Sequence, residues 1–122
     1  MDLRTLHTQA MDLAEKAMIE RALGRLESAK ACLTQALKKE EKAARMAVQN
    51  GAPEPTRSVL LKSAAHLAVD AGELRLAEQL VAMALAGDPP GEIADELRSL
   101  FAEIALCRKR SDMGRAPKMS KK

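Results

Sequence analysis

The sequence predicts an all-α protein, and three observations lead to this prediction. Ala, Leu, Glu, Lys, Arg and Met dominate the 122 residues, and these are strong helix formers. Aromatic residues make up 1% of the chain, whereas β-sandwiches and barrels are rich in aromatic and β-branched residues. Apolar residues also recur with helical spacing, most clearly at Ile93, Leu97, Leu100, Phe101 and Ile104. The length suits one domain.

Turn-forming residues divide the chain into five predicted helices. Two clear breaks fall at residues 50–55, which include two prolines, and at residues 87–91, where an Asp-Pro pair suits a helix N-terminus. Weaker breaks fall at Gly24 and Gly72. The helices are expected at about residues 2–22, 25–49, 56–71, 73–86 and 89–108.

Charge is distributed unevenly along the chain. Residues 108–122 carry seven basic side chains and one acidic one, whereas residues 1–107 carry thirteen basic and sixteen acidic ones. The net charge of +3 therefore arises from the C-terminal segment. No helical period is visible beyond residue 108. We therefore expect one helical domain over residues 1–108 and a basic, disordered tail over residues 109–122.

The sequence shows no motif for catalysis. P-loop, GxGxxG, HExxH and GxSxG patterns are absent, and the two histidines, His7 and His66, fall on different predicted helices. Carboxylate pairs such as Glu40-Glu41 and Asp95-Glu96 are adjacent, so they do not converge and are expected on solvated helix faces. We expect a protein that is not an enzyme and has no cofactor.

Cysteine usage and hydropathy bear on location. Cys32 and Cys107 have no CxxC partner, which argues against a disulfide framework or a metal site and favours inert buried thiols. No apolar run follows a basic start, and none approaches the length of a membrane span. These features predict a cytoplasmic protein without a membrane partner.

An internal repeat is the most informative feature. When the chain is shifted by 48 residues, seven of 25 positions are identical, against about two expected by chance. The aligned pairs are Leu13 and Leu61, Ala17 and Ala65, Gly24 and Gly72, Leu26 and Leu74, Ala29 and Ala77, Ala36 and Ala84, Leu37 and Leu85, and the conservative pair Leu33 and Val81. Small residues at the helix crossings would allow two helical hairpins to pack closely.

This pattern resembles the tetratricopeptide repeat, a helix-turn-helix unit of 34 residues. In the second unit the signature positions read Leu61, Ala64, Ala65, Ala68, Ala77, Val81 and Pro89. In the first unit they read Leu13, Lys16, Ala17, Glu20, Ala29, Leu33 and Glu41, and an extended second helix accounts for the longer spacing. The resemblance implies two tetratricopeptide-like units plus a C-terminal capping helix. A weaker resemblance, carried by Leu13–Ala17 and Leu33–Leu37, is to the MIT module, a three-helix bundle.

The tetratricopeptide resemblance implies a function in binding proteins. In that family the first helix of each unit lines a ligand groove, and the corresponding residues here are Met11, Ala14, Met18, Arg21, Val59, Lys62, His66, Val69 and Asp70. Lys62 and His66 fall one turn apart and could receive an acidic group, although ordinary surface positions are the favoured interpretation. Met11 and Met18 suit either an adaptable binding surface or a core.

The leading hypothesis is a non-catalytic adaptor or scaffold that binds a partner peptide or helix in this groove. One alternative is a basic-tailed accessory protein of nucleic acid or the ribosome. Its phosphate contacts would come from Arg108, Lys109, Arg110, Arg115, Lys118, Lys121 and Lys122. Another alternative is a homo-oligomeric structural protein whose groove is its own interface.

Overall fold

The computed structural model describes the backbone of residues 1–119 and the side chains of residues 1–113. Over this range the chain forms helices and no strands, which confirms the all-α prediction. The five helices are α1 (Leu3–Ala22), α2 (Leu26–Gln49), α3 (Thr56–Asp70), α4 (Leu74–Leu85) and α5 (Gly91–Met119). Four of the five lie within a few residues of their predicted bounds.

The last helix differs from the prediction. α5 continues to Met119, so residues 109–119 are helical where the sequence predicted a disordered tail. Residues 120–122 lie outside the described part of the chain. A helix already nucleated against α4 extends readily through good helix formers such as Lys109 and Arg110, and here it also continues past Gly114 and Pro117, which are poor helix formers. A periodic pattern of apolar residues indicates that one face of a helix is buried. A helix can continue beyond that pattern where all of its faces are exposed to solvent.

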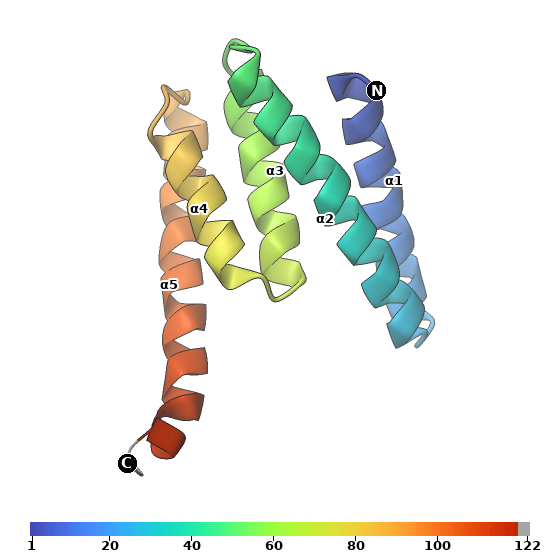
Figure 1. Ribbon diagram of the computed structural model, residues 1–122, viewed down its shortest axis with the longest axis vertical. Helices are drawn as coiled ribbons and strands as arrows, with labels where there is room; N and C mark the ends of the chain where they lie inside the picture. Colours follow the sequence, from blue (N-terminus) through green and yellow to red (C-terminus); the bar gives the residue numbers. More distant parts are fainter. Residues whose placement is uncertain (120–122) are drawn as a thin grey trace.

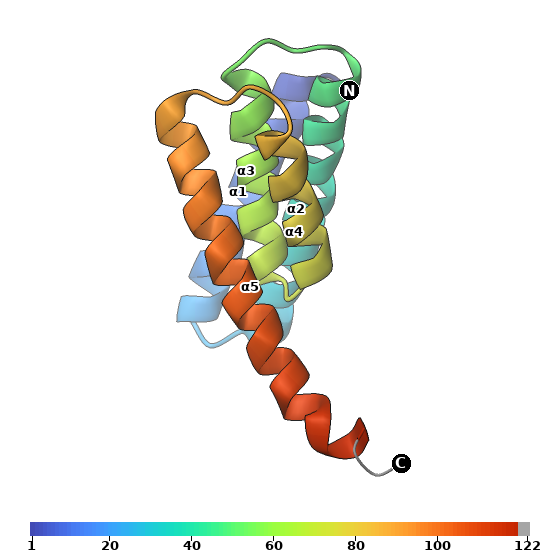
Figure 2. The same cartoon turned by 90° about the vertical axis from the view of Figure 1, so that its left-hand side faces the viewer.

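The helices form an open stack in two layers. α1 packs against α2 and α3 against α4 as antiparallel hairpins, and the hairpins join through contacts of α2 with α3. α5 then packs on α4 and on α3. Figure 2 shows α2 and α4 on one side of α1 and α3, with the C-terminal end of α5 projecting beyond the other helices. Across residues 3–119, the extensive contacts join neighbouring helices and α3 with α5, so the fold is not a closed bundle.

Both hairpins turn through the same backbone structure. Gly24 and Gly72 adopt φ values of 79° and 80°, a region that residues with a Cβ rarely enter. After each glycine, a backbone N–H reaches back to the preceding helix, from Arg25 to the Glu20 carbonyl and from Glu73 to the Ala68 carbonyl, each at 2.8 Å. This is the Schellman arrangement of a helix C-terminus. Gly24 and Gly72 are aligned in the 48-residue repeat, but Gly51 (φ 67°) ends α2 in the same way, so this turn is not specific to the repeat.

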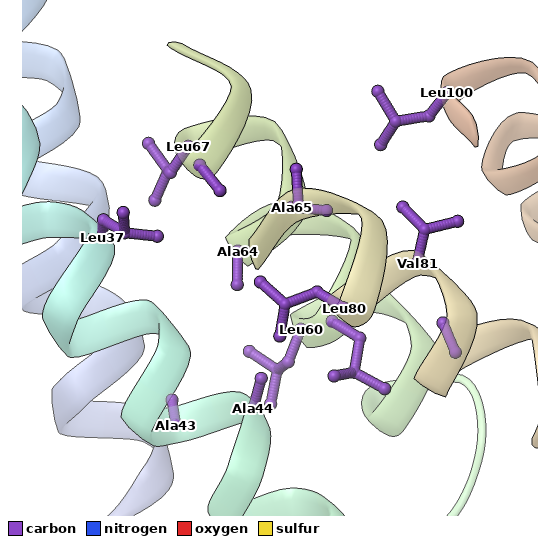
Figure 3. Close-up of a cluster of buried hydrophobic side chains, with 14 of the residues drawn as sticks. Leu37, Ala43, Ala44, Leu60, Ala64, Ala65, Leu67, Leu80, Val81 and Leu100 are labelled. Carbon is purple, nitrogen blue, oxygen red and sulfur yellow. The ribbon is translucent and has the colours of Figure 1, made fainter. Parts of the chain in front are cut away.

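Alanine fills much of the core between the hairpins. Ala43 and Ala44 of α2 are fully buried, as are Ala64 and Ala65 of α3. In Figure 3 they lie in one cluster with leucines of α2, α3 and α4. Because a methyl group occupies so little space, helices that meet through alanine approach closely. The hairpins are therefore held by short side chains along narrow interfaces.

Two acidic side chains fix α1. Asp2 Oδ1 accepts a hydrogen bond of 2.8 Å from the Thr5 backbone N–H, which lowers the pKa of the Asp2 carboxyl below its ordinary value. His7 Nδ1 lies 2.8 and 3.0 Å from the two carboxylate oxygens of Glu40 on α2. A carboxylate accepts, so the His7 Nδ1–H donates to it. Glu40 is fully buried, which contradicts its expected place on a solvated face, because its position on α2 points toward α1.

We predict that Gly72→Ala lowers the free energy of unfolding by about 1 kcal/mol, since an alanine must adopt the strained left-handed conformation there. A Cβ at Gly72 would meet no atom within 4 Å, so the decrease in the free energy of unfolding would come from backbone strain and not from steric overlap. Chemical denaturation measures the change. Gly91→Ala is the matched control, because Gly91 begins α5 without a positive φ and also has open space around it. Equal stability of the two variants would contradict this account of the turns.

We also predict that His7→Ala lowers the free energy of unfolding by about 2 kcal/mol, because it leaves the buried Glu40 carboxylate without its partner. The double substitution His7→Leu with Glu40→Met should recover most of that loss, since it removes the buried charge together with its donor. Thr8→Ala, at an exposed neighbouring position, is the control. A His7→Ala variant as stable as the Thr8→Ala variant would show that the pair does not hold α1.

Candidate partner-binding groove

A groove of about 400 Å³ opens between α1, α2 and α3, at the end of the stack where the α1–α2 turn lies. Four of the predicted groove residues line it: Ala14, Met18 and Arg21 from α1, and Asp70 from α3. Both α1 and α3 therefore contribute residues to this groove.

The remaining wall comes from α2, which sequence reasoning did not include. Leu26, Ala29, Lys30, Leu33 and Thr34 all face the groove. Their spacing of three and four residues marks one helical face, and this was the signal in the sequence that could have identified them. The prediction missed them because it followed the family pattern, in which the first helix of each unit supplies the ligand surface.

The groove combines an apolar floor with charged edges. Ala17 and Ala29 are buried and Leu33 is half-buried, whereas Arg21, Lys30 and Asp70 are exposed at the rim. The rim thus carries two basic side chains, Arg21 and Lys30, and one acidic side chain, Asp70. Such an arrangement favours burial of an apolar side chain in the middle and polar contacts around it.

Large apolar side chains are exposed around the same end of the hairpin. Met18 is 72% exposed and Leu26 is 65% exposed, and both line the groove. Ile19 and Leu23, at the end of α1, are 52% and 59% exposed. Single exposed apolar residues are common, but two large ones that line the same groove, Met18 and Leu26, are typical of a binding surface.

The other predicted groove residues lie elsewhere. Val59 lines a separate hollow of about 440 Å³ at the opposite end of α1 and α3, together with Leu3, Arg4 and His7. Met11 and Val69 are half-buried and pack against the core. Of the two roles considered for Met11, the structure therefore shows the one in the core. The structure therefore does not bring the nine predicted residues into one continuous groove.

Lys62 and His66 face α5, away from α1. They line a hollow of about 430 Å³ with the acidic residues Asp95, Glu96 and Glu103. Lys62 forms an ion pair with Glu96, and His66 is exposed. The Lys62 ammonium already has a carboxylate partner, which leaves it less suited to receive the acidic group of a ligand.

The predicted polyanion contacts are spread along α5. Arg108 forms an ion pair with Glu78 of α4, whereas Lys109 and Arg110 are exposed. Arg115 and Lys118 belong to the helical part of α5, and Lys121 and Lys122 lie outside the described residues.

Other chemical features are sparse over residues 1–113. Cys32 is a buried free thiol and Cys107 a half-buried one. Within this range no three His, Cys, Asp or Glu side chains gather in a way that could hold a metal ion. Among the helices of residues 3–119, none combines the length and apolar character needed to cross a membrane.

Comparison of the chain with protein-family models, with curated proteins and with solved structures gave no match. The assignment of function therefore rests on the geometry and chemistry of the molecule itself.

Proposed function

We propose that this protein is a non-catalytic interaction module of the cytoplasm, which binds an amphipathic helix of a partner protein in the groove between α1, α2 and α3. The observation that carries the proposal is the pair of exposed apolar side chains that line the groove, Met18 and Leu26. Burying them against a partner removes apolar surface from water, which is the main source of affinity in such complexes.

The shape of the groove favours a helix as the ligand. Its walls are helices, its floor is apolar, and a volume of about 400 Å³ accepts a few side chains rather than a folded domain. An amphipathic helix presents apolar residues at positions i, i+3, i+4 and i+7 on one face, so more than one of them can enter the same groove. Met18 supports this use because a flexible thioether adapts to side chains of different shapes.

The rim charges would orient such a partner. Arg21 and Lys30 lie on α1 and α2, whereas Asp70 lies on α3 across the groove. A partner helix with acidic residues on one side of its apolar stripe and a basic residue on the other matches this pattern. Complementary charges of this kind favour one orientation and accelerate association more than they strengthen binding.

The tetratricopeptide-like architecture is part of the same proposal. The two units share the same glycine turn and the same buried alanines, and α5 covers the end of the second unit. Stacked helical hairpins leave a concave surface between the first helices of successive units, which is where peptides bind in repeat proteins of this kind. The contribution of both α1 and α3 to the groove supports this part of the proposal.

Site-specific photo-crosslinking in cells tests the proposal. A photoreactive phenylalanine analogue at Met18 should give a discrete crosslinked partner, which mass spectrometry then identifies. Thr34→Trp places a bulky ring at an exposed position of the groove wall. This second substitution should reduce the crosslinked product about tenfold, the change expected from a loss of about 1.4 kcal/mol of binding free energy.

The control places the same photoreactive residue at Lys42, an exposed position toward the other end of α2. It should give no product that depends on Thr34. If the Met18 derivative gave no crosslinked protein, or if both positions gave the same products irrespective of Thr34→Trp, the groove would not be the binding site.

A further inference from the structure

The outer face of α5 is an unpartnered helix surface. α5 is the last helix of the stack and packs on α4 and α3 along one side only. In Figure 2 the opposite side faces the viewer over its whole length. Ile104 and Leu97 are fully buried on the inner side, whereas Leu106 is 56% exposed and Met113 is 65% exposed. Leu106 and Met113 are seven residues apart, so they lie on the same face of the helix.

The two halves of α5 carry net charges of opposite sign. Residues 91–103 contain four acidic residues and one basic residue, whereas residues 104–119 contain five basic residues and one acidic residue. Within this pattern, Asp95 and Lys109 are fourteen residues apart, and so are Glu96 and Arg110. Fourteen residues make almost four helical turns and about 21 Å, so each acidic residue lies nearly in line with one basic residue. All four side chains are exposed.

We propose that α5 is a self-association surface, on which α5 of a second copy of this chain lies antiparallel across a two-fold axis near Ala102 and Glu103. In this arrangement, Lys109 of each copy meets Asp95 of the other on one side of the contact, and Arg110 meets Glu96 on the other side. Four ion pairs form together because the two-fold axis repeats each contact.

The middle of the contact is small and apolar. Leu106 of each copy lies over Ser99 and Ala102 of the other in this register, and short side chains at these positions allow the two helices to approach closely. Ala102 and Ser99 are exposed in the single chain. The contact therefore covers Leu106, while the charged side chains set the direction and register of the helices.

The intramolecular ion pairs at this surface do not prevent the contact. Asp95 is paired with Arg98 at 3.1 Å and Glu96 with Lys62, but both carboxylates remain mostly exposed, at 80% and 57%. Exposed pairs of this kind contribute little on their own, and a carboxylate can accept from two donors at once. The acidic hollow that Asp95, Glu96 and Glu103 form with α3 is open to the basic half of the partner helix.

A second copy fits this face better than other occupants because the charge pattern is complementary to itself when reversed. A purely acidic helix would match residues 104–119 and be repelled by residues 91–103, and the phosphates of a nucleic acid would meet the same repulsion. Only a ligand with the reverse charge order matches the whole length, and an antiparallel α5 has that order.

Analytical ultracentrifugation of the full chain tests the proposal. From about 10 μM to about 1 mM protein, in about 50 mM NaCl, the sedimentation data should fit a monomer–dimer equilibrium, and about 500 mM salt should weaken it at least about tenfold. The variant Lys109→Glu/Arg110→Glu and the variant Asp95→Lys/Glu96→Lys should each be monomeric, because like charges then face each other. Circular dichroism verifies that both remain helical.

An equimolar mixture of the two charge-reversal variants should restore the dimer, since every reversed residue then meets an opposite charge. A chain that carries all four substitutions should also dimerise. Lys38→Glu/Lys42→Glu changes the net charge as much as Lys109→Glu/Arg110→Glu does, but at exposed positions of α2, and it should dimerise like the natural chain.

A monomer at every concentration in low salt would overturn the proposal, as would a dimer that neither charge-reversal variant disrupts. If that monomer bound duplex RNA through Lys109 and Arg110, the surface would be assigned to a polyanion instead. A mixture that failed to restore the dimer would likewise exclude the antiparallel register.

Discussion

Close approach of helices through alanine is the constraint on which the rest of the structure depends. With one phenylalanine and no tryptophan or tyrosine, the chain has almost no large rings to hold helices apart. Alanines at the helix crossings are fully buried instead, among them Ala36 in the first unit and Ala65, Ala77 and Ala84 in the second. Because each contributes little apolar area, stability depends on many short contacts that must all fit. The same constraint makes any added volume in these interfaces costly.

The repeat explains why most residues that line the candidate groove come from the first unit. Equivalent residues of the two units differ in burial according to how many neighbouring helices they have. Leu61 is fully buried on α3, which has helices on both sides, whereas its equivalent Leu13 on α1 is half-buried. Leu26 is 65% exposed, and its equivalent Leu74 is half-buried. The first unit thus leaves more exposed the apolar positions that the second unit buries more deeply against its own neighbours, and one of them, Leu26, lines the groove.

The sequence predicted the fold well because the signals for it are local. Prolines, glycines and apolar periods located five helices, and the repeat predicted which of them pair. It could not predict how far α5 extends, since a helix anchored at one end needs no buried face to continue. Nor could it place Glu40 in the core, because the adjacent acidic residue suggested a solvated face while the partner, His7, is 33 residues away.

The candidate groove was predicted only in part, for a geometric reason. The family pattern places one face of α1 and α3 toward a common ligand, and Ala14, Met18 and Asp70 follow it. Lys62 and His66 do not, because α3 turns that part of its surface toward α5. How two helices rotate relative to each other is set by packing between distant residues, which a periodic pattern in one sequence does not specify.

The most direct measurement of the central claim compares the unfolding free energies of Ala65→Leu and Ala82→Leu. Both substitutions add the same side chain to a helix, but Ala65 is fully buried on α3 and Ala82 is exposed on α4. The account predicts that Ala65→Leu lowers the free energy of unfolding by about 1–3 kcal/mol through overpacking. It predicts that Ala82→Leu changes this free energy by less than about 0.5 kcal/mol. Equal stability of the two variants would contradict the close approach of the helices through alanine.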